Sequence, residues 1–303
     1  MISIVLTIFA NVKQKLDYIK TIDWHNHLKY TIQEDFGSGK GSGDHSSNAC
    51  FGLNEKGTAK LRSKENGIIA GMELLPSIFN LFDKEIAWEK IKCDGDNVEN
   101  NEIILSAYGP IKSLLGVERI MLNYIQRLSG IATLTNLMSK KLEGTNCKLL
   151  DTRKTTPGWR YLEKYAVRVG GGHNHRMGLY DYIMLKDNHI DYCGSIKKAV
   201  SQTKDYLDRH QLTREIEVEV RNLKEVKEAM DEKYINRIML DNFSVEMCSS
   251  AVELINGEKE IEISGGIDIS NIRKYALSGI DFISSGSLTH SAKNLDLNFK
   301  ADI

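Results

Sequence analysis

Residues 216–220 read Ile-Glu-Val-Glu-Val, a short strand-like run that is apolar on one side and acidic on the other. Side chains alternate between the two faces of a strand, so Glu217 and Glu219 point the same way. An open sheet covered by helices on both faces should not bury two carboxylates. A barrel can direct at least one of them towards a mouth that holds ligand. The alternation therefore favours a barrel.

Five similar runs rich in Ile, Val and Leu lie before and after this one, at spacings of 21 to 34 residues. They are residues 148–151, 182–186, 237–241, 261–264 and 282–285. Strands separated in this way by helical stretches form βαβ units, which require a parallel sheet. We expect the intervening helices at residues 195–207, 222–233, 244–255 and 270–278. Six such strands predict an α/β fold, either a barrel or a doubly wound sheet.

The first ~115 residues follow a different pattern, typical of a mixed α+β domain. Strands are predicted within 57–72 and 103–107, a helix at 74–82, and a long helical connection at 114–137. The glycine-rich stretch 37–43 lacks the Ser or Thr that follows the lysine of a phosphate-binding loop, which indicates a flexible surface loop.

Composition excludes several classes of protein. The 303 residues carry 40 Lys and Arg against 41 Asp and Glu, so nothing in the net charge favours nucleic acid or an acidic membrane surface. Five cysteines without a CxxC pair indicate reduced thiols in a cytoplasmic protein. The apolar residues 1–12 have no basic flank and are too few to span a bilayer. We expect them to pack as a helix or strand.

Polar groups follow every strand-like run. The segments concerned are 151–154, 186–189, Glu219, 241–242, 264–266 and 285–287. Because functional residues of parallel barrels lie at the carboxyl ends of strands, we expect these groups to share one mouth. Any binding site should be there.

The groups fall into three chemical kinds. Residues 153–189 hold seven Lys and Arg against three acids, which suits carboxylates and phosphates. Glu219 and Asp241 suit sugar hydroxyls or a magnesium ion. The Gly/Ser turns at 264–266 and 285–287 suit a phosphate. A phosphoribosyl diphosphate together with an acidic acceptor fits this combination.

Other interpretations of these residues remain open. Arg160, Lys164 and Arg168 have helical spacing and predict a solvated helix face. The pairs 25/27 and 173/175 have the spacing of metal ligands on a strand. We expect His25 to be a surface or packing residue, and His175 to bind an anion, because the adjacent Arg176 would repel a cation. We assign no role to Asp151. Of the two glutamates, we expect Glu217 rather than Glu219 to have a structural role.

Three segments, 151–158, 170–176 and 183–189, carry a resemblance. They read Asp-Thr-Arg-Lys-Thr-Thr-Pro-Gly, Gly-Gly-Gly-His-Asn-His-Arg and Ile-Met-Leu-Lys-Asp-Asn-His. Together they resemble the quinolinate phosphoribosyltransferases, also called nicotinate-nucleotide pyrophosphorylases (carboxylating). The similarity continues in order through 216–220, 238–242, 263–267 and 284–290, and it covers the chain from about residue 30 onwards.

The resemblance implies a fold and a reaction. The fold would be an N-terminal α/β sandwich domain at 1–118, with the tail 291–303 packing back on it, followed by an incomplete parallel α/β barrel at 119–290. Quinolinate would react with 5-phosphoribosyl 1-diphosphate, giving nicotinate mononucleotide, carbon dioxide and diphosphate for NAD biosynthesis. The protein would be a cytoplasmic homodimer, or a higher oligomer, with active sites shared across the interface.

The resemblance also implies roles for individual residues. Lys186, Glu219 and Asp241 would be catalytic. The substrate-binding residues would be Arg119 from the neighbouring subunit, Thr152, Arg153, Lys154, His175, Arg176, Lys186, Glu219, Asp241, Ser264, Gly265, Gly266, Ser285, Gly286, Ser287 and His290. Of these, Arg153, His175, Arg176 and Lys186 would grip the quinolinate carboxylates. Mg²⁺ would accompany the diphosphate, with no metal assigned to protein ligands.

The chain departs from the family pattern in places. The family usually has a compact Glu-Asp-x-Gly-x-Gly-Asp-x-Thr, where this chain inserts extra Gly, Ser and Lys between Glu34 and Asp44. Arg221 replaces a common glutamate, and Ser287 a common alanine.

Three alternative functions remain open. The first is a related phosphoribosyltransferase that acts on a different acid, such as the paralogue associated with molybdenum transport. The others are a barrel metallohydrolase that uses the two His-x-His pairs, and a non-catalytic sensor of small molecules.

Overall fold

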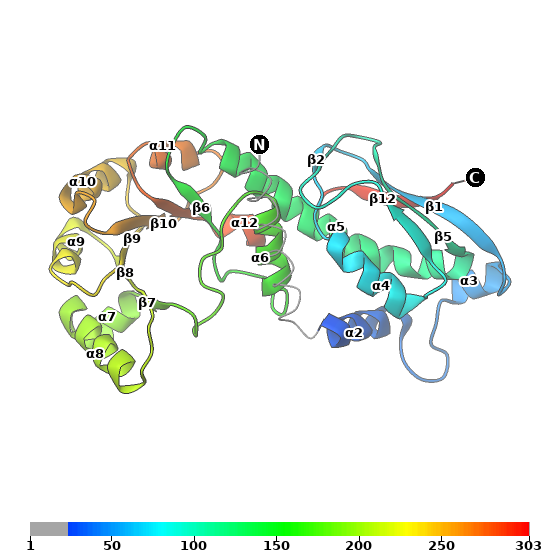
Figure 1. Ribbon diagram of the computed structural model, residues 1–303, viewed down its shortest axis with the longest axis horizontal. Helices are drawn as coiled ribbons and strands as arrows, with labels where there is room; N and C mark the ends of the chain where they lie inside the picture. The colour runs from blue at the N-terminus through cyan, green and yellow to red at the C-terminus, as the bar shows by residue number, and fades with distance from the viewer. Residues whose placement is uncertain (1–23, 303) are drawn as a thin grey trace, which may run out of the picture. The chain divides into compact units, whose positions relative to one another are not determined.

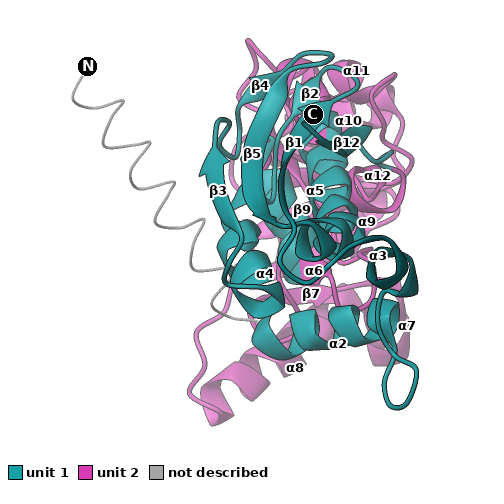
Figure 2. Cartoon of the chain, turned by 90° about the vertical axis from the view of Figure 1, so that its right-hand side faces the viewer, with its two compact units in different colours: residues 1–134, 161–171, 292–303 teal, residues 135–160, 172–291 magenta. Residues whose placement is uncertain are grey.

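A computed structural model describes residues 24–302, and the expectation for residues 1–12 lies outside them. The chain forms two compact units (Figure 2). The first comprises residues 1–134, 161–171 and 292–303, and the second comprises 135–160 and 172–291. The domain limits expected from the sequence, 1–118 and 119–290, stay a prediction, because a compact unit need not be a domain that folds alone.

The first unit is built on an antiparallel sheet with the strand order β12-β1-β5-β3. Its strands are β1 (Lys56–Ser63), β3 (Ala87–Lys90), β5 (Ile103–Pro110) and β12 (Leu297–Ala301), and a separate pair is formed by β2 (Gly67–Ile68) and β4 (Asn97–Val98). Along β1, Ala59, Leu61 and Ser63 are buried while the residues between them are partly exposed. This period of two shows that one face of the sheet is covered.

Helix α5 (Ile111–Lys140) runs along that sheet, with α4 (Leu75–Phe82) beside it (Figure 1). The first unit also contains α2 (Trp24–Phe36), α3 (His45–Cys50), the 3₁₀ turn η1 (Met72–Leu74) and nearly all of α6 (Arg160–Val169). A β-carbon on Gly130 of α5 would lie 1.9 Å from the carbonyl oxygen of Lys293. Glycine therefore allows the C-terminal segment to pass against this helix.

Helix α6 corrects one expectation from the sequence. Lys164 was expected on a solvated face, but it is fully buried, as is its neighbour Glu163. The carboxylate of Glu163 accepts two hydrogen bonds from the guanidinium of Arg127, at 3.1 and 2.8 Å. Helical spacing located the charges correctly, but it could not show that protein covers this face of the helix as well.

The second unit is a six-stranded parallel sheet with the order β6-β11-β10-β9-β8-β7. The strands are β6 (Lys148–Leu150), β7 (Ile183–Leu185), β8 (Ile216–Val220), β9 (Arg237–Asp241), β10 (Glu260–Ser264) and β11 (Phe282–Ser284). Neighbours pair in chain order from β7 to β11, and β6 then joins β11. Among the described residues, β6 and β7 do not pair. The sheet is thus an incomplete α/β barrel, as expected.

Four helices of this unit lie where the sequence predicted helices: α8 (Ile196–Arg209), α9 (Leu223–Met230), α10 (Val245–Ile255) and α11 (Ile272–Ala276). Two short helices, α7 (Asp187–Cys193) and α12 (Ser287–His290), were not predicted. Ser195, Asn222 and Ser244 accept hydrogen bonds from backbone N–H groups of α8, α9 and α10. Such caps satisfy N–H groups that lack a partner within the helix.

Two further expectations concern the chain as a whole. All five cysteines are free thiols, as their spacing predicted. In the described part of the chain, no helix combines the length and the apolar character that crossing a bilayer requires.

Candidate active site

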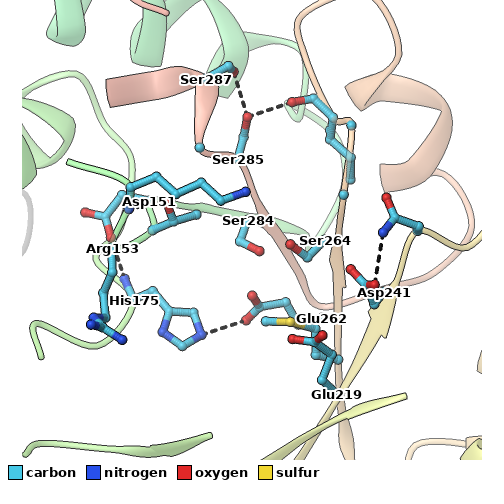
Figure 3. Close-up of a pocket in the computed structure, with 18 of the residues that line it drawn as sticks. Asp151, Arg153, His175, Glu219, Asp241, Glu262, Ser264, Ser284, Ser285 and Ser287 are labelled. Carbon is cyan, nitrogen blue, oxygen red and sulfur yellow. Dashed lines mark hydrogen bonds and ion pairs between the residues drawn. The ribbon is translucent and has the colours of Figure 1, made fainter. Parts of the chain in front are cut away.

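A cavity of about 540 Å³ lies at the carboxyl ends of the strands of the second unit. Figure 3 shows side chains from several strands converging on it. All of the expected substrate-binding residues line the cavity except Arg119, which belongs to the other compact unit. The volume lies within the roughly 300–1,000 Å³ typical of small-molecule sites. The common mouth predicted from the strand ends is therefore present.

Several residues that line the cavity had no catalytic or binding role predicted from the sequence. They are Asp151 and Asn242, which were expected only among the polar strand ends around the mouth, and Met184, Met239, Glu262, Ile267, Asp268 and Ser284. Glu262 had a detectable signal, because residues 260–264 repeat the acidic and apolar alternation of residues 216–220. In the structure Glu217, Glu219 and Glu262 all lie in the interior of the barrel, at most 7% exposed.

Two guanidinium groups stand together at the basic end of the cavity. Within residues 24–302, neither Arg153 nor Arg176 forms an ion pair with a carboxylate, although both line the cavity. Burial and the neighbouring charge of Arg153 lower the pKa of Arg176. Arg176 is partly buried and Arg153 is exposed, so the two like charges repel each other with only partial screening by water, and a bound dianion would relieve that repulsion. This end of the cavity is thus built for an acidic ligand.

Lys186 and Glu219 form an ion pair at the centre. Their Nζ and Oε2 atoms lie 2.7 Å apart, with the lysine side chain 46% exposed and the glutamate 8%. Lys186 ends β7 and precedes α7, and its backbone N–H donates to Nδ1 of His189 at 3.0 Å. An exposed ammonium held by a buried carboxylate is fixed in direction yet remains accessible to a ligand.

The next strand ends supply an acid and a tight turn. Asp241 at the end of β9 accepts a hydrogen bond from the Asn242 amide at 2.9 Å. Gly265 follows β10 with φ +104°, and a β-carbon there would lie 2.1 Å from Oδ1 of Asn242. Only glycine fits this position without moving Asn242.

A second polar turn follows β11. The Ser285 hydroxyl donates to the carbonyl of Ile267 at 2.6 Å and lies 2.7 Å from the Ser287 hydroxyl. A β-carbon on Gly286 would come within 2.9 Å of the Lys154 side chain and 3.0 Å of the His290 ring. The absence of a side chain at Gly286 therefore lets both basic groups approach the turn.

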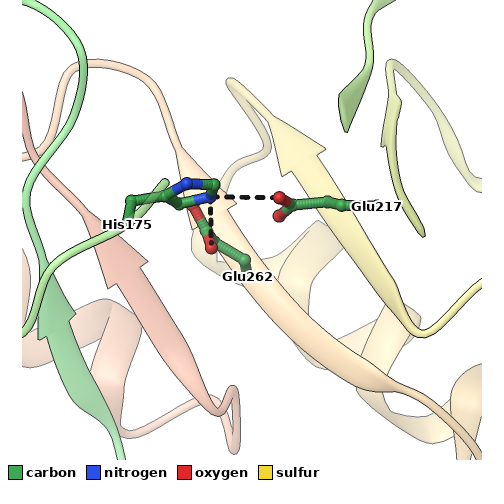
Figure 4. Close-up of side chains that lie close together, drawn as sticks. All are labelled: His175, Glu217 and Glu262. Carbon is green, nitrogen blue, oxygen red and sulfur yellow. Dashed lines mark hydrogen bonds and ion pairs between the residues drawn. The ribbon is translucent and has the colours of Figure 1, made fainter. Parts of the chain in front are cut away.

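A cluster of charged groups lies beneath the basic end (Figure 4). Nε2 of His175 is 3.0 Å from Oε2 of Glu217 and 3.4 Å from Oε2 of Glu262. Arg237 on β9 donates to Glu262 at 3.0 Å, and its guanidinium stacks over the Phe282 ring at 3.8 Å. Both glutamates are fully buried.

Burial and mutual charge shift the pKa values of this cluster. Burial favours neutral His175, but hydrogen bonds and charge from the two glutamates outweigh it and raise its pKa to about 9. Burial and the charge of Glu262 raise the pKa of Glu217 to about 7. Burial opposes ionisation of Glu262, yet His175, Ser284 and Arg237 lower its pKa overall. Because Nδ1 of His175 accepts a hydrogen bond from the Arg176 N–H, this nitrogen carries no proton, and Nε2–H donates to Glu217. We infer that the additional proton of the cluster resides on Glu217.

Comparison with known proteins adds independent findings. The family model described as the N-terminal domain of quinolinate phosphoribosyl transferase matches residues 44–129, and that of the C-terminal domain matches 131–300. A nicotinate-nucleotide pyrophosphorylase [carboxylating] of Arabidopsis thaliana is 41% identical over 93% of this chain and 84% of its own length. A probable nicotinate-nucleotide pyrophosphorylase [carboxylating] of Bacillus subtilis is 40% identical over 90% and 93%.

Solved structures agree with these sequence matches. The crystal structure of NadC from Streptococcus pyogenes is similar with a TM-score of 0.85 and 43% identity, covering 91% of this chain and 94% of that one. A nicotinate-nucleotide pyrophosphorylase from Ehrlichia chaffeensis gives a TM-score of 0.87 at 35% identity, covering 93% and 100%.

Proposed function

The chain belongs to the quinolinate phosphoribosyltransferase family, and we propose that the cavity of the second unit is where its reaction takes place. The enzyme transfers the phosphoribosyl group of 5-phosphoribosyl 1-diphosphate to quinolinate with decarboxylation. The products are nicotinate mononucleotide, carbon dioxide and diphosphate, as a step of NAD biosynthesis. The proposal concerns which residues perform which part of this reaction.

One observation supports the placement most strongly: Arg153 and Arg176 share the basic end of the cavity without a carboxylate partner among residues 24–302. Quinolinate carries two adjacent carboxylates, and guanidinium groups bind carboxylates through paired hydrogen bonds. We assign these two arginines, with the ammonium of Lys186, to the quinolinate carboxylates. His175 is considered separately below.

The remaining strand ends suit the second substrate. Glu219 and Asp241 carry acceptors for ribose hydroxyls, while Lys154 and His290 flank the turn at Gly286. The turns 264–266 and 285–287 present glycine backbone and serine hydroxyls, which suit the 5′-phosphate. A phosphate site after the last two strands recurs in α/β barrels.

This arrangement fits the chemistry of both steps. Attack of the quinolinate nitrogen on the anomeric carbon breaks the bond to diphosphate and builds positive charge on the ribose. The carboxylate of Glu219 lines the cavity and can stabilise that positive charge, so catalysis rests on positioning and electrostatics. When the adjacent carboxylate leaves as carbon dioxide, the electron pair of the broken bond stays on the ring carbon, where the neighbouring pyridinium nitrogen stabilises it. That carbon then takes a proton from water.

Magnesium is part of the proposal as a partner of the diphosphate. Asp241 is partly exposed at the mouth and suits a hard cation, whereas Glu219 is paired with Lys186 and the exposed Asp268 accepts hydrogen bonds from Ser270. So small a set of available carboxylates fits a metal that arrives with its substrate better than one held by the protein alone. When bound, Mg²⁺ would neutralise charge on the departing diphosphate.

We also propose a homodimer with active sites shared across its interface. Arg119 was implied as a substrate ligand, and in this chain it belongs to the unit that does not contain the cavity. Donation from a second copy would complete the set of cations around quinolinate. The five free thiols fit a cytoplasmic location, which is likewise a proposal.

The experiment that tests the function is direct. Purified protein is incubated with MgCl₂, phosphoribosyl diphosphate and quinolinate carrying ¹⁴C in its 2-carboxylate. Release of ¹⁴CO₂ together with an equal amount of nicotinate mononucleotide is expected. Parallel reactions with nicotinate should give no product, and turnover of nicotinate in preference to quinolinate would contradict the proposal.

A further inference from the structure

The His175 ring has no nitrogen directed at a ligand. Nε2 faces the carboxylates of Glu217 and Glu262, and Nδ1 accepts a hydrogen bond from the backbone N–H of Arg176 at 2.7 Å. The backbone N–H of His175 itself donates to Oδ1 of Asp151 at 2.9 Å. Its side chain is only 6% exposed. A residue bound on every polar atom is placed to hold structure.

We propose that His175 is a positioning residue: clamped by Glu217 and Glu262, its ring fixes the backbone of Arg176 and thereby aims that guanidinium at the substrate carboxylates. This inference rests on the proposed function of the cavity. It departs from the expectation that His175 itself grips quinolinate.

The segment carrying Arg176 needs such a clamp because it is not part of a strand. Residues 174–182 connect the isolated bridge at His173 to β7 without regular structure. Its backbone is held by side chains instead. Asp181 accepts from the N–H groups of Met177 and Gly178 at 2.7 and 2.9 Å. The ring of His175 supplies the corresponding contact at Arg176.

The clamp is itself anchored in the barrel. Glu217 lies on β8, Glu262 on β10, and Arg237 on β9 between them. Arg237 pairs with buried Glu262 at 3.0 Å and with exposed Glu260, at the start of the same strand, at 2.8 Å. The ring is therefore tied to three adjacent strands. This anchoring holds the Arg176 backbone in place beside the like charge of Arg153.

His175, Glu217 and Glu262 are close enough to be considered as metal ligands, since their ligand atoms lie within 4.8 Å of one another. Arg237 argues against that role, because its guanidinium already supplies a cation to Glu262 at 3.0 Å. A positive ion between them would face that charge at close range.

A double-mutant cycle distinguishes positioning from direct binding. We expect His175→Ala to lower kcat/KM for quinolinate about 30-fold at saturating phosphoribosyl diphosphate, because displacing a binding group by about 1 Å has effects of that order. In an Arg176→Ala background, His175→Ala should cause less than about a twofold further loss. In an Arg153→Ala background, its full effect should remain. Multiplicative losses with Arg176→Ala would overturn the inference.

A matched pair of variants tests the clamp without altering His175. Glu262→Gln and Glu260→Gln each remove one carboxylate from Arg237, but only Glu262 contacts the ring. We expect Glu262→Gln to raise the KM for quinolinate about tenfold while leaving the KM for phosphoribosyl diphosphate unchanged. Glu260→Gln should change neither constant. Equal effects from both variants would place the cause in Arg237 and count against the clamp.

Two controls separate this inference from the proposed function. Unaltered protein and Glu260→Gln must both form nicotinate mononucleotide, and failure of both would refute the function rather than the clamp. If His175→Ala does not fold, as judged by its thermal transition, the comparison of Glu262→Gln with Glu260→Gln still tests the clamp. Stoichiometric transition metal in purified protein would assign the cluster to metal binding and overturn the clamp.

Discussion

The ammonium of Lys186 lies 2.7 Å from the carboxylate of Glu219 at the mouth of the barrel. Lys186 directly follows β7, and Glu219 lies near the end of the adjacent parallel strand β8. Lys186 is about half exposed, so the pair contributes little to stability but fixes the direction of the ammonium. The relationship makes Lys186 available to a ligand and Glu219 available to stabilise positive charge above it.

Replacing Lys186 should therefore abolish catalysis while preserving the fold. We expect Lys186→Ala to reduce kcat by at least about 10²-fold, the effect of removing one charge-stabilising group. Its thermal transition should match that of the unaltered protein. Lys204→Ala serves as the control, because Lys204 pairs with Asp208 on α8 and does not line the cavity. Near-normal turnover by Lys186→Ala would refute its assignment.

The turn after β10 makes a prediction about stability. Gly265→Ala should lower the free energy of unfolding by about 1–3 kcal/mol, since φ is +104° and the new methyl group would meet Asn242. Gly266→Ala is the matched comparison, because its φ of +60° also disfavours alanine but nothing lies within 4 Å of its β-carbon, so its loss of stability should be smaller. Urea denaturation measures both free energies of unfolding. Equal losses in the two variants would show that the contact with Asn242 does not matter.

The buried cluster predicts how stability depends on pH. The pKa of Glu217 is raised from 4.5 to about 7, so its contribution to stability is complete below pH 4.5 and is lost as pH rises through 7. The two glutamates also raise the pKa of His175, so both shifts have the same sign. Because Nδ1 of the ring accepts from the Arg176 N–H, we assign the single additional proton to Glu217 and expect a loss of about 3 kcal/mol between pH 4.5 and 8.

Glu217→Gln should flatten that dependence. The variant leaves Glu262 and Arg237 as a balanced pair, so the cluster no longer needs an additional proton. The other groups around the ring, Tyr182 and Asp151, are unchanged. Chemical denaturation at half-unit pH intervals gives the comparison. An equally steep decline in Glu217→Gln would show that other groups cause it.

Removal of divalent metal should stop turnover without affecting the folded protein. We expect EDTA to eliminate activity and added MgCl₂ to restore it. The reason is that the diphosphate supplies most of the metal ligands and Asp241 is an accessible acid at the mouth. The thermal transition without substrate should be the same with and without EDTA. A large fall in that transition on chelation would instead indicate a metal bound by the protein itself.

The sequence predicted the strands of the barrel well because each is a short apolar run ending in a polar group. Residues 216–220, for example, form β8 as expected. The alternation also placed Glu217 and Glu219 on one face, but it could not distinguish their partners. Those partners, His175 and Lys186, come from segments distant in the sequence that only the folded barrel brings near.

Other features could not be predicted for a similar reason. Helical spacing gave α6 but not the burial of Lys164, because burial depends on what packs against a helix. The His175 contact with Arg176 is local, yet it matters only because Glu262 and Arg237 anchor the ring. Long-range partners of buried polar groups are set by the fold, whereas periodicity reports only which face a residue occupies.

Sharing of active sites between subunits can be tested by mixing two inactive variants. Arg119→Ala and Lys186→Ala should each lack activity as homodimers. In a dimer of one copy of each, one cavity would receive intact Lys186 with intact Arg119 from its neighbour, while the other would lack both. Random exchange of subunits makes half the dimers mixed, so we expect recovery of about one quarter of normal activity. If Arg119 instead served the cavity of its own chain, both cavities of every mixed dimer would lack one residue and no activity would return.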